Sequence, residues 1–272
     1  MIPKVIHYCW FGGNPLPESA LKCIESWKKY CPDYEIKEWN ETNIDVTSVD
    51  YMREAYEVKA WGFVPDVARL QIIYECGGIY LDTDVEIIKS FDPLLQHDAF
   101  MGIETGTTKR NNFIALGLGF GAERRNELIG YLLNDYKKKH FNSNERKEDP
   151  LPAPLLQLPL FVEKGFTEKN ELQIVGGATV YPSDFFSPLS VITGALTITE
   201  NTYSIHHYNA SWASEDGKEY IKMRQTVYQK WGILARVIWA AKSIKLKMNS
   251  LGFNKTILLL LDKLKLYFRK NL

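Results

Sequence analysis

The chain of 272 residues lacks the features that mark several large protein classes. Its four cysteines form no CxxC pair and all lie in the first third of the sequence, which argues against a zinc ribbon and a disulfide scaffold. No run of about 18 apolar residues occurs, so we expect no membrane-spanning helix. The N-terminus, MIPKVIHYCWFGG, has no apolar stretch long enough for a signal peptide. We therefore expect a protein of the reducing cytosol.

Net charge is also absent, but the charged residues are unevenly distributed along the chain. From Ile221 to Leu272 there are twelve Lys and Arg and one acid, Asp262, which leaves 21 basic and 32 acidic side chains in the first 220 residues. A basic tail on an acidic body is typical of a tail that seeks an anionic surface. The sequence thus predicts a main domain over residues 1–220 and a basic amphipathic helical tail over residues 221–272.

The main domain has the composition and the element order of an α/β protein. Hydrophobic residues make up 45% of the chain and aromatic residues 13%, enough for a sizeable core and too much for intrinsic disorder. Near the N-terminus, a strand (KVIHYCW), a helix (PESALKCIESWKKY) and a second strand (YEIKEWN) follow one another. This order predicts a βαβ unit on a mainly parallel sheet.

The most distinctive stretch of the sequence is PDVARLQIIYECGGIYLDTDVEII. Pro65 suits the first position of a helix, Asp66 suits its positive end, and two glycines end it. The residues after the glycines predict one continuous strand, in which Asp82 and Asp84 would point the same way because side chains alternate across a strand.

Two carboxylates that converge on one small volume repel each other, and a hard divalent cation resolves this repulsion. Mg²⁺ and Mn²⁺ prefer oxygen ligands, and ligands of open α/β sheets lie beyond the carboxyl ends of the strands, where this pair is expected. Two alternatives remain open. The pair could belong to a solvated turn, or to a phosphatase of the haloacid dehalogenase type, although Glu86 stands where those enzymes carry Thr or Val.

Asp66 and Arg69 lie on one face of the preceding helix, at spacing i, i+3. They could form a polar clamp beside the metal. They could also be a surface ion pair that contributes about 0–1 kcal/mol to stability.

Three stretches together resemble glycosyltransferase family 32: IPKVIHYCWFGG, VPDVARLQIIYECGGIYLDTDVEIIKSFDPLL and SIHHYNASW. The resemblance covers about residues 2–212. It implies a GT-A fold with a mixed, mainly parallel central sheet and C-terminal helices, and residues 1–220 as the catalytic domain. It also implies a UDP- or GDP-linked sugar donor, a divalent metal (Mn²⁺ or Mg²⁺) and transfer with retention of anomeric configuration.

The resemblance also assigns roles to single residues. Asp84 is similar to the direct metal ligand, and Asp82 to the residue that holds the donor ribose and sugar and could reach the metal through water. Asp66 and Arg69 resemble the pair that grips the hydroxyls of the donor sugar. Tyr80 resembles the tyrosine near the donor phosphates.

Two further parts of the donor site are implied at the ends of the resemblance. Trp10 resembles an aromatic residue that stacks on the nucleobase, and a core tryptophan is an equal alternative. Near residue 206, a late strand of related enzymes supplies a third metal ligand, for which we favour His206 over His207. Ser211 and Trp212 resemble a Ser-Trp pair that contacts the leaving diphosphate.

The resemblance thus implies a metal-dependent hexosyltransferase acting on a glycan acceptor of capsule or lipopolysaccharide type, and we expect no nucleic-acid partner. Such acceptors are lipid-linked glycans at the inner membrane surface, where the basic tail would dock the enzyme. A non-catalytic protein of the same fold that binds sugar nucleotides or acts as a scaffold is the alternative function. For the tail, packing on the catalytic domain or on a second subunit is the alternative.

Overall fold

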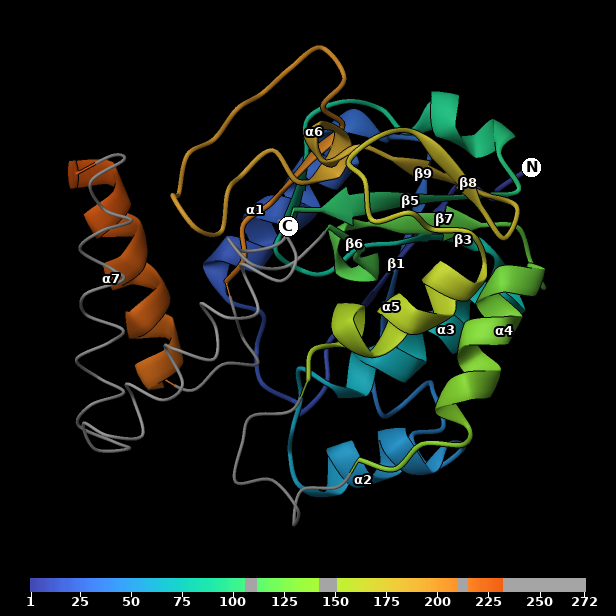
Figure 1. The fold of residues 1–272 in the computed structure, drawn as a ribbon. Coiled ribbons are helices and arrows are strands. Elements are labelled where there is room, and N and C mark those ends of the chain that lie inside the picture. Colours follow the sequence, from blue (N-terminus) through green and yellow to red (C-terminus); the bar gives the residue numbers. More distant parts are fainter. Residues whose placement is uncertain (106–111, 142–150, 210–214, 232–272) are drawn as a thin grey trace, which may run out of the picture. The chain divides into compact units, whose positions relative to one another are not determined.

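The computed structural model describes residues 1–105, 112–141, 151–209 and 215–231, and for residues 215–221 the backbone alone. Its centre is an eight-stranded sheet with the order β2-β1-β3-β7-β5-β9-β8, in which β6 pairs with β5 (Figure 1). The strands are β1 (Val5–Cys9), β2 (Glu35–Trp39), β3 (Gly78–Tyr80), β5 (Ala99–Glu104), β6 (Phe113–Ile114), β7 (Phe120–Ala122), β8 (Gln173–Val175) and β9 (Ala178–Tyr181).

The sheet is mixed, and most of its strands run in one direction. β2 and β3 are both parallel to β1, while β7 is antiparallel to β3 and to β5. β5 therefore runs in the same direction as β3, and β9 is parallel to β5. The sequence prediction of an α/β protein with a mixed, mainly parallel sheet is confirmed.

Helices and two hydrophobic clusters cover both faces of this sheet. One cluster joins α3 and α4 to sheet residues such as Tyr80 and Met101, and the other joins α1 to their sequence neighbours Ile79 and Phe100. Adjacent residues of one strand thus enter opposite cores, as strand geometry requires. The helices of residues 1–190 are α1 (Glu18–Tyr30), α2 (Asp50–Glu57), α3 (Val64–Cys76), α4 (Glu127–Tyr136), α5 (Ala153–Glu163) and α6 (Ser183–Phe186), with 3₁₀ turns η1 (Asp92–Gln96) and η2 (Leu116–Leu118). A further helix, α7 (Glu215–Trp231), belongs to a separate unit of the chain.

The prediction of one continuous strand through the paired aspartates is wrong. β3 ends at Tyr80, a turn follows, and the chain continues as β4 (Val85–Ile87) in a separate sheet, where β4 pairs antiparallel with β10 (Ser204–His206). The backbone N–H of Val85 donates to the carbonyl of Asp82 at 3.1 Å and closes this turn. The aspartates therefore lie in the connection between two sheets, and strand alternation does not set their directions.

The chain divides into two compact units, the first made of residues 1–190 and 196–214. The second unit contains α7 and residues 191–195, where the carbonyl of Val191 accepts hydrogen bonds from Arg224 at 3.1 Å and from Gln225 at 3.3 Å. Among the described residues, no helix is both long and apolar enough to cross a bilayer. Most of the predicted tail, residues 232–272, lies outside the described residues, so the domain boundary stays a prediction.

The side chain of His7 on β1 contacts Trp39 on β2 and Gly77, which precedes β3. From its burial we predict that acid destabilises the fold. Its ring is buried, its Nδ1 accepts from the Trp39 indole at 3.0 Å, and its Nε2 lies 3.0 Å from the Gly77 carbonyl. Because an indole N–H can only donate, Nδ1 is unprotonated and Nε2 carries the hydrogen. Burial lowers the pKa of His7 from 6.5 to about 4.

The unfolded chain therefore binds more protons than the folded chain between pH 4 and pH 6.5. The contribution of His7 to the free energy of unfolding is complete above pH 6.5 and falls by about 3 kcal/mol as the pH drops toward 4. Urea unfolding at several pH values should show that the free energy of unfolding falls less between pH 6.5 and pH 4 in His7→Gln than in the wild type. The exposed His207, changed to Gln, serves as the control, and equal slopes in all three proteins would contradict the prediction.

Candidate active site

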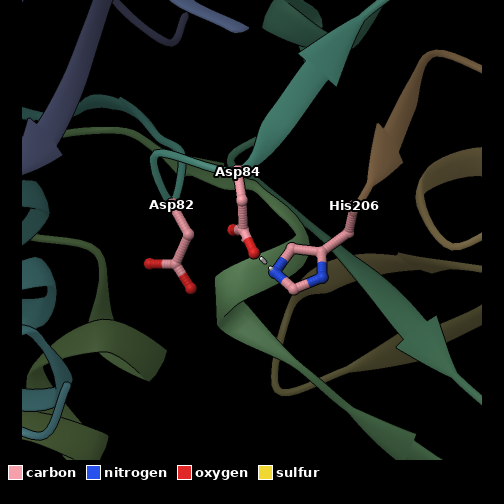
Figure 2. Close-up of side chains that lie close together, drawn as sticks. All are labelled: Asp82, Asp84 and His206. Carbon is pink, nitrogen blue, oxygen red and sulfur yellow. Dashed lines mark ion pairs between the residues drawn. The ribbon is translucent and has the colours of Figure 1, made fainter. Parts of the chain in front are cut away.

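Asp84 and His206 face each other from the two strands of the small sheet. Asp84 immediately precedes β4, His206 ends β10, and the antiparallel register pairs His206 with Val85. The His206 Nε2 lies 3.2 Å from Asp84 Oδ1, and both side chains are largely buried (Figure 2). The other carboxylate oxygen of Asp84 accepts the backbone N–H of Asn209 at 2.8 Å. Pairing of β4 with β10 thus brings a residue 122 positions later in the chain to the aspartate turn.

Asp82 is held from the other side by a buried network on α3 and β3. Its Oδ1 accepts from the Tyr80 hydroxyl at 3.1 Å and lies 3.4 Å from Arg69 Nη2. The same Arg69 nitrogen is 3.2 Å from Asp66 Oδ1, and Arg69 Nε donates to the Pro65 carbonyl at 2.9 Å. The Arg69 side chain is only 7% exposed, so the sequence alternative of a surface ion pair is wrong.

Asp82, Asp84 and His206 fit a divalent cation. Each can offer one ligand atom, and the three atoms lie within 4.8 Å of one another. Two neighbouring ligands of an octahedral ion at about 2.1 Å stand about 3 Å apart, close to the separation of His206 Nε2 and Asp84 Oδ1. Two carboxylates and an imidazole suit Mn²⁺ or Mg²⁺. His207 points elsewhere, since its Nε2 lies 2.9 Å from Glu86 Oε2.

The electrostatics of the site are those of tightly coupled opposite charges. Burial alone would raise the pKa of Asp84, but the charge of His206 and the hydrogen bonds of the carboxylate lower it to about 2. Burial alone would lower the pKa of His206, but Asp84 raises it to about 9. Burial raises the pKa of Asp66 to about 7, against the pull of Arg69. The site therefore holds strongly interacting ionisable groups, as functional sites commonly do.

Four further residues were predicted to bind the donor, namely Tyr80, Trp10, Ser211 and Trp212. Tyr80 is buried beneath the guanidinium of Arg69, which lies 5.0 Å from the centre of its ring. Trp10 follows β1, is partly exposed and donates its indole N–H to the Asn14 carbonyl at 2.6 Å. Ser211 and Trp212 lie outside the described residues.

Gly117 is a site residue that the sequence did not reveal. It lies in η2, and a Cβ added there would overlap Asp82 Oδ2 and approach Arg69 Nη1 to 3.4 Å. We expect a GLGFG sequence to allow close backbone packing, here near the acceptor side, and the sequence does not identify Asp82 as the neighbour. The absence of a side chain at Gly117 leaves the space that the Asp82 carboxylate occupies.

We expect Gly117→Ala to lower donor turnover about tenfold or more, because the Asp82 carboxylate must leave its position beside Arg69. Thermal unfolding and nucleotide release with Mn²⁺ should be measured together. Gly165→Ala is the control, since its positive φ of 104° makes the change costly for stability but nothing lies within 4 Å of the added atom. Normal turnover in Gly117→Ala would show that Asp82 is not held by this contact.

The sequence comparisons point to one family. Residues 17–101 match the family model of the glycosyltransferase sugar-binding region containing a DXD motif. The chain is 31% identical over 122 residues to inositol phosphoceramide mannosyltransferase 3 of Schizosaccharomyces pombe, a match that covers 43% of this chain and 34% of that protein. It is also 31% identical over 115 residues to inositol phosphoceramide mannosyltransferase 1 of the same organism, a match that covers 37% of this chain and 33% of that protein. The chain thus spans about a third of the length of these relatives.

A solved structure of a glycosyltransferase involved in the glycosylation of the major capsid of PBCV-1 aligns with 81% of this chain and 100% of its own, at 13% identity and a TM-score of 0.47. The family match includes Asp66, Arg69 and both aspartates of the turn, whereas His206 lies outside it. Residues 17–101 are thus similar to the DXD-containing sugar-binding region of glycosyltransferases.

Proposed function

We propose that this chain is a metal-dependent glycosyltransferase that moves a hexose from a UDP- or GDP-linked donor to a hydroxyl of a glycan acceptor, with retention of anomeric configuration. The observation that carries the proposal is the convergence of Asp82, Asp84 and His206 beside the buried Asp66–Arg69 pair. A DXD motif alone is a weak signal, but here a distant strand adds a third donor atom to it.

Asp84 and His206 would hold the ion directly, with Asp82 bound directly or through water. The bound Mn²⁺ or Mg²⁺ would neutralise the donor diphosphate and stabilise it as a leaving group. Arg69 keeps Asp82 in place and offers guanidinium hydrogens to donor oxygens, while the Asp66 carboxylate offers acceptors to sugar hydroxyls. Because these groups are fixed before the donor binds, little reorganisation is needed during transfer.

The acceptor is proposed to be lipid-linked. The relatives from Schizosaccharomyces pombe are named as mannosyltransferases of inositol phosphoceramide, which supports a lipid carrier and a mannosyl donor among those to be tested. A glycan of capsule or lipopolysaccharide type remains the acceptor that we favour.

We further propose that the enzyme acts at the inner face of the cell membrane. The tail over residues 221–272 interleaves Trp, Ile, Leu and Phe with Lys and Arg, a composition typical of interfacial helices. Each basic residue near anionic lipid contributes about 1 kcal/mol to binding. The full-length protein should float with anionic vesicles at low salt, and a protein ending at Tyr228 should not. If neither floats, the tail packs on protein instead.

The activity is tested by release of free nucleotide from UDP-glucose, UDP-galactose and GDP-mannose, with Mn²⁺ and without acceptor. Slow release that EDTA abolishes supports the enzyme. Binding of a nucleotide sugar, seen as a rise in Tm, without any release would favour the alternative of a non-catalytic sugar-nucleotide-binding protein.

A further inference from the structure

Glu104 lies at the same edge of the sheet as the aspartate turn. It is the last residue of β5, and β5 runs in the same direction as β3, which ends just before Asp82. The 3₁₀ turn η2, which holds Gly117 against Asp82, packs against both β5 and β10. One short turn thus contacts β5, β10 and the Asp82 carboxylate.

The second feature of Glu104 is that its carboxylate lacks a polar partner within the part of the chain that the structure describes. Its side chain is partly buried, and among the described residues its carboxylate has no hydrogen bond and no ion pair. Burial raises the pKa of Glu104 to about 7, with the charge of His206 as the opposing influence. Partial burial of a carboxylate without a partner is unfavourable, and a bound hydroxyl group can supply the missing hydrogen bond.

Glu104 points to the same face of β5 as Phe100, because side chains alternate along a strand, and Phe100 belongs to the hydrophobic cluster that packs against Tyr208. Tyr208 is fixed there by a 2.7 Å hydrogen bond between its hydroxyl and Ser187 Oγ, and its ring centre lies 4.2 Å from that of His206. Asp66 and Asp82 already share Arg69. In the proposed function, Asp66 and Arg69 bind the donor sugar. The side of the site with the Glu104 carboxylate is therefore available to the second substrate.

We propose that Glu104 is a catalytic residue that accepts a hydrogen bond from the hydroxyl group attacking the donor sugar, whether this hydroxyl belongs to the acceptor or, in its absence, to water. The inference rests on the proposed function. A carboxylate is a strong acceptor for a hydroxyl hydrogen, and Glu104 points to the face of β5 whose cluster packs against Tyr208, two residues after the metal ligand His206. If retention results from attack on the face from which the leaving group departs, the attacking hydroxyl lies near the metal ligands that would hold the diphosphate.

The transfer step balances without another reactant. The attacking oxygen forms a bond to the anomeric carbon, and the bond between that carbon and the diphosphate oxygen breaks, with its electron pair remaining on the diphosphate. The proton of the attacking hydroxyl passes to a diphosphate oxygen. Glu104 orients the hydroxyl and is unchanged at the end.

The test uses water as the attacking group, so that it needs no knowledge of the natural acceptor. The full-length Glu104→Gln protein is compared with the wild type for Mn²⁺-dependent nucleotide release, with whichever of UDP-glucose, UDP-galactose and GDP-mannose the wild type hydrolyses. We expect kcat to fall about 10- to 100-fold, because a neutral amide is a weaker acceptor than a carboxylate. KM for the donor should change less than about threefold, since Glu104 does not hold the donor.

Two further measurements separate this role from a structural one. The Tm of Glu104→Gln should equal or exceed that of the wild type, because the variant removes an unpartnered carboxylate from a partly buried position. The rise in Tm that Mn²⁺ and UDP or GDP produce should be unchanged. Glu171→Gln, an exposed carboxylate near Lys169, is the matched control and should leave kcat unchanged.

Each outcome decides a different claim. If the wild type releases nucleotide and Glu104→Gln keeps its kcat, the inference about Glu104 is overturned while the proposed function stands. A large rise in donor KM or the loss of the Tm shift would place Glu104 in donor or metal binding and also overturn it. If the wild type releases no nucleotide from any of the three donors, the proposed function fails, and this inference fails with it.

Discussion

Asp84→Asn should reduce Mn²⁺-dependent nucleotide release by about 10³-fold, because the loss of one ligand charge removes most of the stabilisation that a bound cation gives to the departing diphosphate. The Asp84 carboxylate makes two contacts, one oxygen facing His206 at 3.2 Å and the other accepting the Asn209 N–H at 2.8 Å. An asparagine side chain keeps one acceptor oxygen, so the backbone hydrogen bond can persist. The ion pair, and with it the electrostatic pull on His206, is lost.

A binding measurement separates this effect from damage to the fold. The wild type should show a rise in Tm with Mn²⁺ and nucleotide together, and Asp84→Asn should lose this rise while still unfolding cooperatively. Asp33→Asn, which removes a carboxylate paired with Lys4 on an exposed surface, should keep both the rise and the activity. Activity that persists in Asp84→Asn, or in the wild type with EDTA, would rule out the metal mechanism.

The sequence predicted the helix before the aspartate pair correctly, but the continuous strand that it predicted through the pair is interrupted by a turn. The helix Val64–Cys76 and its end at the glycine pair are as expected, because a proline near the start and glycine at the end are strong local signals. The strand after it was predicted as continuous, since IYLDTDVEII is apolar enough to extend. The break after Tyr80 depends on pairing of β4 with β10, which lies more than 100 residues away and leaves no local signal.

The same limit applies to the rest of the site. The local sequence around Gly117 and Glu104 does not mark either residue as part of a site, because their roles depend on what packs against them. The two adjacent histidines differ only in which acid they face, Asp84 for His206 and Glu86 for His207. Local sequence could name the residue types of a metal site, but only the register of β10 distinguishes these two rings.

The second large effect is expected at Arg69, where replacement by lysine keeps the charge and should still lower kcat/KM for donor release by about 100-fold. The guanidinium reaches three directions at once: Nε donates to the Pro65 carbonyl, and Nη2 lies near both Asp66 and Asp82. Lysine offers a single ammonium group and cannot reproduce this planar fork. We expect the variant to leave either the Pro65 carbonyl or the Asp82 carboxylate unsatisfied, so that Asp82 is no longer held for the donor.

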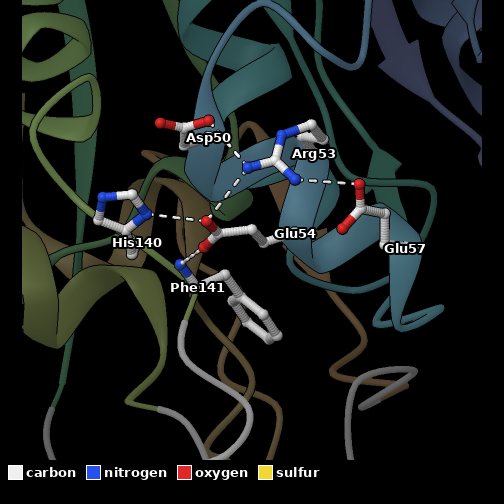
Figure 3. Close-up of polar contacts among 6 residues, drawn as sticks. All are labelled: Asp50, Arg53, Glu54, Glu57, His140 and Phe141. Atoms are coloured by element: carbon white, nitrogen blue, oxygen red, sulfur yellow. Dashed lines mark hydrogen bonds and ion pairs between the residues drawn. The ribbon is translucent and has the colours of Figure 1, made fainter.

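Arg53→Lys on α2 is the matched control for this substitution. Arg53 also contacts several carboxylates, Asp50 at 2.9 Å, Glu57 at 3.0 Å and Glu54 at 3.3 Å, but it does so at the surface (Figure 3). Exposed pairs of this kind contribute little and tolerate a point charge, so kcat/KM should change less than about twofold. Steady-state release kinetics and thermal unfolding of both variants provide the comparison. If Arg69→Lys keeps wild-type turnover at saturating donor and loses only stability, the Arg69 network supports the fold and does not position Asp82 for catalysis.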